Sequence, residues 1–106
     1  MSKYLVKASY TSDGVKGLLK EGASNRKKAV EELIGSMGGK MEAFYFAFGD
    51  YDLYCIFDIA DDITAAALAL TINGSGLVSC STTVLISAED LEKAKNKVVP
   101  YRGPGQ

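Results

Sequence analysis

The sequence contains no histidine and no tryptophan. The absence of histidine excludes metal sites built on imidazole, acid–base catalysis by histidine, and a Ser-His-Asp triad within one chain. Only two cysteines occur, Cys55 and Cys80, and their spacing matches neither a CxxC redox motif nor a zinc-binding set. Because each lies in an apolar, strand-like segment, we expect both to be reduced cysteines of the core.

Long hydrophobic runs are also lacking. The longest, residues 65–70, is far shorter than the ~20 residues that a membrane-spanning helix needs. The amino-terminal residues carry Lys3 and Lys7 close together and include no apolar segment of the kind found in signal peptides. We therefore expect a cytoplasmic protein with no membrane partner.

Basic residues are absent from residues 41–92, which hold nine acidic residues. Residues 1–40 hold eight basic and four acidic residues, and residues 93–106 hold four basic and no acidic residues, so the net charge is −1. The one short basic run, at Lys27 and Lys28, is followed by two glutamates that cancel its charge. Since nucleic-acid-binding domains are usually basic, we expect no nucleic-acid partner.

At 106 residues the chain has room for one domain, expected over residues 1–99, with a tail over residues 100–106. Alternating apolar residues predict strands, and apolar residues three or four positions apart predict helices. The predicted strands are residues 3–11, 40–48, 51–59 and 77–86, and the predicted helices are residues 15–37, 63–72 and a short one that begins after Ser87. The order βαββαβ with a short C-terminal helix predicts an α+β, ferredoxin-like fold, in which two helices cover one face of a four-stranded antiparallel sheet.

Two of the predicted helices have distinct apolar patterns. Residues 15–37 form one apolar face centred on Leu19, with Gly22 as the place where the helix can kink or split. Residues 63–72 are apolar nearly all round, so we expect this helix to be buried on more than one side.

Both faces of the predicted sheet carry apolar side chains. In the third strand, Leu53, Cys55, Phe57 and Ile59 alternate with Asp52, Tyr54, Ile56 and Asp58; in the second, Met41, Ala43, Tyr45 and Ala47 alternate with Glu42, Phe44, Phe46 and Phe48. The ferredoxin-like layout covers only one face with helices. Because a large apolar patch on a monomer is a liability, the sequence predicts a homodimer or a higher homo-oligomer.

The hairpin residues Gly49, Tyr51 and Asp52 resemble the signature of the GYD-domain family of small bacterial and archaeal proteins. Further stretches resemble the first half of that family and its second helix; these are residues 3–6, 9–11, 14–18, 26–27, 38–40 and 65–70. The resemblance implies a dimeric α/β barrel, the architecture of antibiotic-biosynthesis monooxygenases, haem-degrading enzymes and muconolactone-isomerase-like proteins. It implies no particular reaction. The haem enzymes of this superfamily use a histidine ligand, which this chain lacks, and we expect no cofactor.

Arg26 is the first candidate functional residue. At ~100° per residue it falls near the centre of the apolar face of its helix, so its side chain is expected to point toward the sheet. A guanidinium is costly to bury without a partner. Either it bonds to Glu42, Asp52 or backbone carbonyl groups, or reaches solvent, or it anchors an anionic ligand.

The predicted hairpin supplies the other candidates. Asp52 and Tyr54 share a face by alternation, and Tyr45 lies nearby in the preceding strand, so a carboxylate and phenols can together bind a small polar ligand. The structural alternative is that Asp52 accepts backbone N–H groups at the turn while Tyr51 packs. The aspartates of this region match no calcium-loop spacing, so we expect no metal site.

Three hypotheses of function follow. The first is a homodimeric protein that binds a small aromatic or anionic molecule between sheet and helices, with Arg26, Tyr45, Asp52 and Tyr54 as pocket residues. The second is a cofactor-independent monooxygenase- or isomerase-like enzyme that uses the same pocket. The third is a structural or assembly subunit without a pocket.

Overall fold

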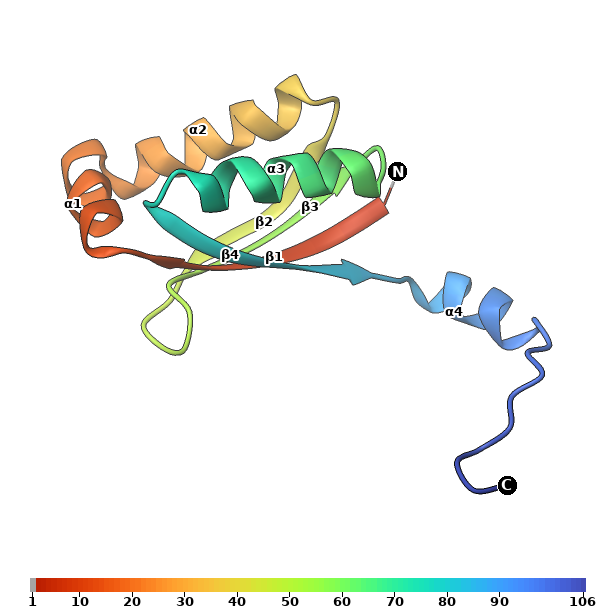
Figure 1. Ribbon diagram of the computed structural model, residues 1–106. Coiled ribbons are helices and arrows are strands. Elements are labelled where there is room, and N and C mark those ends of the chain that lie inside the picture. The colour runs from red at the N-terminus through yellow and green to blue at the C-terminus, as the bar shows by residue number, and fades with distance from the viewer. Residues whose placement is uncertain (1) are drawn as a thin grey trace.

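A computed structural model of the protein describes residues 2–106. The elements are β1 (Ser2–Tyr10), α1 (Ser12–Glu21), α2 (Ala23–Ser36), β2 (Lys40–Phe46), β3 (Leu53–Ile59), α3 (Asp62–Gly74), β4 (Val78–Leu85) and α4 (Ala88–Lys95). The strands form one antiparallel sheet in the order β2-β3-β1-β4. Helices α2 and α3 lie across one face of it (Figure 1). The predicted α+β, ferredoxin-like fold is confirmed.

The first predicted helix is divided in two at Gly22. This glycine has a φ of 94°, which L side chains rarely adopt, and it ends α1 and precedes α2. The apolar residues on its two sides therefore share no single face: Leu19 is 79% exposed, whereas Ile34 of α2 is 1% exposed. The predicted continuous face centred on Leu19 is wrong because the turn at Gly22 resets the helical phase.

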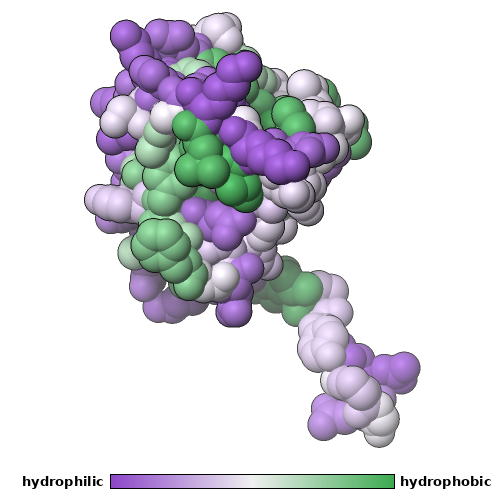
Figure 2. Space-filling view, turned by 90° about the vertical axis from the view of Figure 1, so that its left-hand side faces the viewer, coloured by the Kyte–Doolittle hydropathy of each residue, from purple (hydrophilic) through white to green (hydrophobic). Residues whose placement is uncertain are grey.

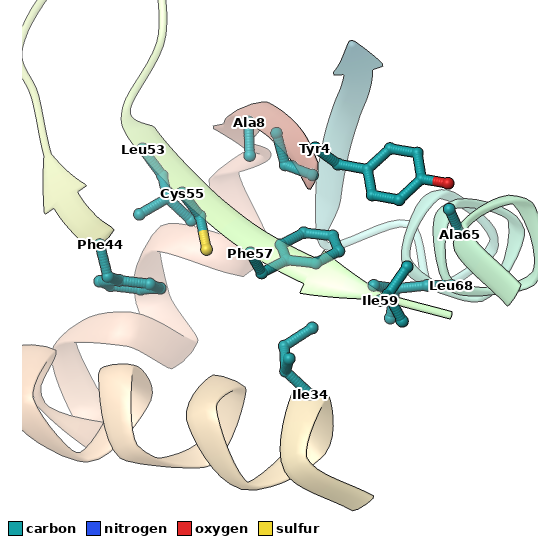
Figure 3. Packing of buried hydrophobic residues seen from close by; sticks show 11 residues of the cluster. Tyr4, Ala8, Ile34, Phe44, Leu53, Cys55, Phe57, Ile59, Ala65 and Leu68 are labelled. Atoms are coloured by element: carbon teal, nitrogen blue, oxygen red, sulfur yellow. The ribbon is translucent and has the colours of Figure 1, made fainter. Parts of the chain in front are cut away.

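The core lies between the sheet and the two covering helices. Tyr4, Ile34 and Ile59 are the largest fully buried side chains, and Figure 3 shows how residues of β1, β3, α2 and α3 meet there. The burial of β3 alternates as predicted, with Leu53 and every second residue after it toward the helices. Cys55 is buried in this core, and both cysteines are free thiols.

None of the helices in the described part of the chain covers the opposite face of the sheet (Figure 1). Ala43, Ile56, Leu5 and Thr83 are successive partners across the four strands and form a row on this face, which we call the open face; the first three of them are apolar. A register shift between Met41 and Ala43 turns Met41 to the other side, where it packs against the core. The predicted placement of Met41 beside Ala43 is thus wrong, because a bulge interrupts the alternation of side chains.

Residues 86–106, here called the C-terminal arm, project from the body of the molecule (Figures 1 and 2). The long axis measures 56 Å against 33 and 23 Å for the other two, and the radius of gyration is 16.9 Å, compared with about 13 Å for a compact chain of 100 residues. None of the helices in residues 2–106 is long and apolar enough to cross a membrane.

Candidate functional site

Two adjoining hollows lie on the helix side of the sheet. The inner one is a pocket of about 60 Å³ among the core residues between α2, α3 and the strands. The outer one is a cleft of about 360 Å³ between α1, α2 and the end of α3. The residues that line both are Tyr10, Arg26, Ile72 and Val78. The hollows therefore adjoin at these four residues. The lining of the inner one is mostly apolar, and the wider outer one also contains Asp13, Glu21, Thr71 and Ser75.

Arg26 lies where the two hollows meet. It lies on α2 two turns before the buried Ile34, so its side chain runs along the same helix face into the cleft. The side chain is 36% exposed, and its Nη1 lies 3.8 Å from Oε1 of Glu21. A half-exposed ion pair of this length contributes little to stability. Within residues 2–106, Glu21 is the only carboxylate at ion-pair distance from Arg26.

The carboxylates expected to meet Arg26 bond elsewhere. Glu42 accepts a hydrogen bond from Lys3, and Asp52 accepts one from the backbone N–H of Tyr10 at 2.8 Å. The break at Gly22 instead places the last residue of α1, Glu21, beside the first turn of α2. Of the alternatives left open for Arg26, pairing with Glu42 or Asp52 is therefore not found, and Arg26 keeps a partly exposed guanidinium at the cleft.

Tyr10, which the sequence analysis did not single out, is the second polar group shared by both hollows. It ends β1 on the side that faces the helices. Burial raises the pKa of its phenol above the ordinary value of 10.0, and the nearby Arg26 guanidinium lowers it in part. The phenol therefore stays protonated at neutral pH and can donate a hydrogen bond beside a fixed positive charge.

Asp52 positions Tyr10 and does not line either hollow. In addition to accepting the N–H of Tyr10, it donates its own N–H to the carbonyl of Ala8 at 2.9 Å, and its carbonyl accepts the N–H of Ala47 at 2.8 Å. The bonds to Tyr10 and Ala8 fix the start of β3 to the end of β1, and the bond from Ala47 extends the β2–β3 pairing beyond Leu53. Asp52 thus makes the backbone contact that the structural alternative describes.

Tyr45 and Tyr54 lie on the open face, on the far side of the sheet from the cleft. They are direct partners in the β2–β3 pairing, and Tyr45 is 70% exposed. Tyr54 packs edge-on against Tyr51, with ring centroids 6.1 Å apart, and the Nζ of Lys7 lies 4.9 Å from the Tyr51 ring centroid. Of the four predicted pocket residues, the structure thus places only Arg26 in the cleft. Asp52 is connected to the cleft by its bond to Tyr10, and Tyr45 and Tyr54 lie on the open face.

The two thiols lie in or beside the inner pocket. Burial raises the pKa of Cys55 to about 11, and it also raises the pKa of Cys80. Neither thiol is ionised at neutral pH, so neither is an activated nucleophile. Among residues 2–106, no three acidic or cysteine side chains gather as a metal site would require.

A comparison with protein-family models gives one match, the GYD domain, over residues 4–94. The chain belongs to the GYD-domain family. The match covers the sheet, the cleft and most of α4, so the family resemblance carried by the hairpin extends to the whole fold. Searches of curated proteins and of solved structures returned no match. In the hairpin of this GYD-domain protein, Tyr51 packs against Tyr54 of the open face. Asp52 accepts the backbone N–H of Tyr10 at the end of β1.

Proposed function

We propose that this GYD-domain protein is a homodimer that binds a small molecule with an apolar body and an anionic end in the cleft between helices and sheet. The observation that carries the proposal is the position of Arg26 and Tyr10, which line both the inner pocket and the outer cleft. A carboxylate at the mouth can take a charge-assisted bond from Arg26 and a second hydrogen bond from the Tyr10 phenol. The apolar body then extends toward Val30, Ile72 and Cys80.

The size of the cleft supports binding over a purely structural role. Its volume of about 360 Å³ falls in the range of roughly 300 to 1,000 Å³ that is usual for small-molecule sites. A structural subunit would fill this space with side chains. The charge also supports an anion, because the glutamate nearest to Arg26 is itself 39% exposed and neutralises the arginine only weakly.

The homodimer is supported by the open face. Leu5 and Ile56 lie at its centre, with Tyr45 and Tyr54 in the next row, and no helix within residues 2–106 covers them. Pairing two such faces buries apolar surface on both copies at once. Light scattering at micromolar concentration is expected to give at least twice the chain mass of 11.3 kDa, and Ile56→Asp is expected to lower it. A stable single-chain particle of the unaltered protein would remove this part of the proposal.

Titration of the protein with benzoate, octanoate and the neutral analogue benzamide, followed by amide NMR shifts, tests the binding site. We expect benzoate or octanoate to shift Tyr10, Ile72 and Val78, and benzamide to bind more weakly. Loss of a charge-assisted bond of about 1.5 to 3 kcal/mol predicts at least ~10-fold weaker binding in Arg26→Met. Lys27→Met, which removes an exposed charge from the same helix, is the matched control and should bind normally.

Probe binding and melting temperature together show whether Arg26 is a binding residue or a structural one. If Arg26→Met binds as tightly as Lys27→Met, or if neither acid shifts the cleft residues, the proposed site is wrong. If Arg26→Met melts well below Lys27→Met without altered binding, the arginine is a structural residue.

A cofactor-independent isomerase- or monooxygenase-like enzyme is the second candidate. The observation that favours it is the protonated phenol of Tyr10 beside Arg26, which is suited to proton transfer to or from a bound anion. Phenylpyruvate in D₂O is a direct probe, because its methylene protons exchange through an enol. Faster exchange with the protein than with Tyr10→Phe would support an enzyme; equal rates would leave binding as the function.

A further inference from the structure

The C-terminal arm exposes apolar side chains between residues 86 and 101. Ile86 and Leu91 are each 59% exposed, Val98 is 95%, Val99 is 75% and Tyr101 is 77% exposed. No residue of α4 is buried. A solvated tail has no need of such residues, and an exposed apolar segment of this kind marks an interaction site.

A second uncovered apolar surface lies on α3. Ile63, Ala66, Ala67 and Leu70 follow one another at helical spacing on its outer side and are all exposed, with Ile63 at 82% and Leu70 at 75%. Ala65 and Leu68 are the only buried residues of α3. The expectation that this helix is buried on more than one side is therefore not met within one chain, which leaves its outer stripe available to a partner.

The two surfaces have complementary charges. The helix begins at Asp61 and Asp62, and no basic residue occurs between residues 41 and 92. The arm begins with three acidic residues, Glu89, Asp90 and Glu92, but its remainder, residues 93–106, carries four basic residues and no acidic ones, namely Lys93, Lys95, Lys97 and Arg102. The ion pairs of Lys93 and Lys95 with carboxylates of their own helix are exposed, so they are weak and can be exchanged.

The start of α4 directs the arm away from its own chain. Ser87 caps this helix by accepting the N–H of Asp90 at 3.1 Å, immediately after β4 ends. Folding the arm back over α3 of the same chain would require a reversal at this residue and the loss of the cap, which costs about 1 kcal/mol. Beyond the cap, the arm provides about 12 Å of helix and up to about 35 Å of extended chain, enough to cross a neighbouring subunit.

We propose that the C-terminal arm of one copy docks on the outer stripe of α3 in a second copy, with the arm lysines next to Asp61 and Asp62 of that copy. This contact is separate from the open-face dimer and does not depend on it. It gives one explanation for two apolar surfaces that a single chain leaves uncovered.

Zero-length carbodiimide cross-linking tests the proposal, because it joins a lysine only to a carboxylate in direct contact. Equal amounts of ¹⁴N- and ¹⁵N-labelled full-length protein are unfolded together in urea, refolded and cross-linked. The proposal predicts peptides that join Lys93, Lys95 or Lys97 to Asp61 or Asp62, with mixed isotopes. Same-isotope products alone would show that the arm folds on its own chain, and the absence of such peptides would show that it docks elsewhere; either result overturns the proposal.

Three exposed positions provide the variants. Val99→Asp in the arm and Leu70→Asp on α3 should each abolish the mixed-isotope peptides, while Leu19→Asp on α1, a residue of similar exposure outside both surfaces, should retain them. Circular dichroism establishes that each variant folds. Unchanged cross-linking in both Val99→Asp and Leu70→Asp would also overturn the proposal.

Discussion

The carboxylate of Asp52 accepts the backbone N–H of Tyr10 at 2.8 Å. This bond connects the hairpin between β2 and β3 to the end of the strand that supplies the cleft with its phenol. The family's hairpin residue therefore acts at a distance from the cleft, through the position of Tyr10. It follows that a change at Asp52 should affect both the stability of the sheet and the geometry of the site.

Asp52→Ala should destabilise the protein by about 1 to 3 kcal/mol, because it leaves the Tyr10 N–H without its acceptor in a partly buried position. Thermal unfolding followed by circular dichroism measures this loss. Asp50→Ala is the control, since Asp50 is an exposed residue of the same loop and should unfold near the wild-type temperature. Equal stability of the two variants would mean that the Asp52 bond does not hold the hairpin to β1.

Gly22→Ala should destabilise the protein by about 1 to 2 kcal/mol, because the φ of 94° is strained for an L side chain. It should also weaken probe binding, since the break at Gly22 places Glu21 beside Arg26. Gly35→Ala is the matched control: this glycine lies within α2, a Cβ there meets no atom within 4 Å, and the change should stabilise the helix by about 0.5 to 1 kcal/mol. Denaturant unfolding of both variants checks the prediction, which fails if they shift in the same direction.

The phenol of Tyr10 should titrate above its ordinary pKa of 10.0, chiefly because it is buried. A phenol whose pKa is higher in the folded protein favours the folded state below pH 10, and this contribution is lost as pH rises through the two pKa values. The unfolding free energy of the wild type should therefore fall more steeply above pH 10 than that of Tyr10→Phe. Parallel curves for the two proteins would contradict the burial of this phenol.

Cys55 and Cys80 should react slowly with iodoacetamide at pH 8 in the folded protein, because burial raises the pKa of both thiols. Cys80, which is only partly buried, should react faster than Cys55. Since both thiols line the inner pocket, bound benzoate should slow Cys80 further. Mass spectrometry of the modified peptides gives both rates, and fast labelling of Cys55 would show that the core opens readily.

The order of strands and helices could be predicted because each element carries its own periodicity, as in the alternation of β3 from Leu53 to Ile59. Two local errors had local causes. The face centred on Leu19 assumed that the helical phase continues past Gly22 even where the helix splits there, and the positive φ of Gly22 changes that phase. The placement of Met41 assumed unbroken alternation, and the bulge that turns it inward depends on pairing with β3.

The candidate site was less predictable, because it depends on which strand face meets the helices. Alternation shows that Tyr45 and Tyr54 each lie on one side of a strand, but not that this side is the open face. Arg26 was predicted to point toward the sheet from a face centred on Leu19. It does line the cleft, but it does so from the face of α2 that carries Ile34, which the predicted face did not include. Tyr10 could have been found from the sequence as the last inward residue of its strand, a polar group at the end of an otherwise apolar row.

Native mass spectrometry of the protein purified from its own source, alongside Arg26→Met and Lys27→Met prepared in the same way, tests the central claim most directly. The account predicts a mass of two chains or more for all three proteins, with a retained small molecule on the wild type and on Lys27→Met, and none on Arg26→Met. A single-chain mass, or the same small molecule retained equally by Arg26→Met, would contradict it.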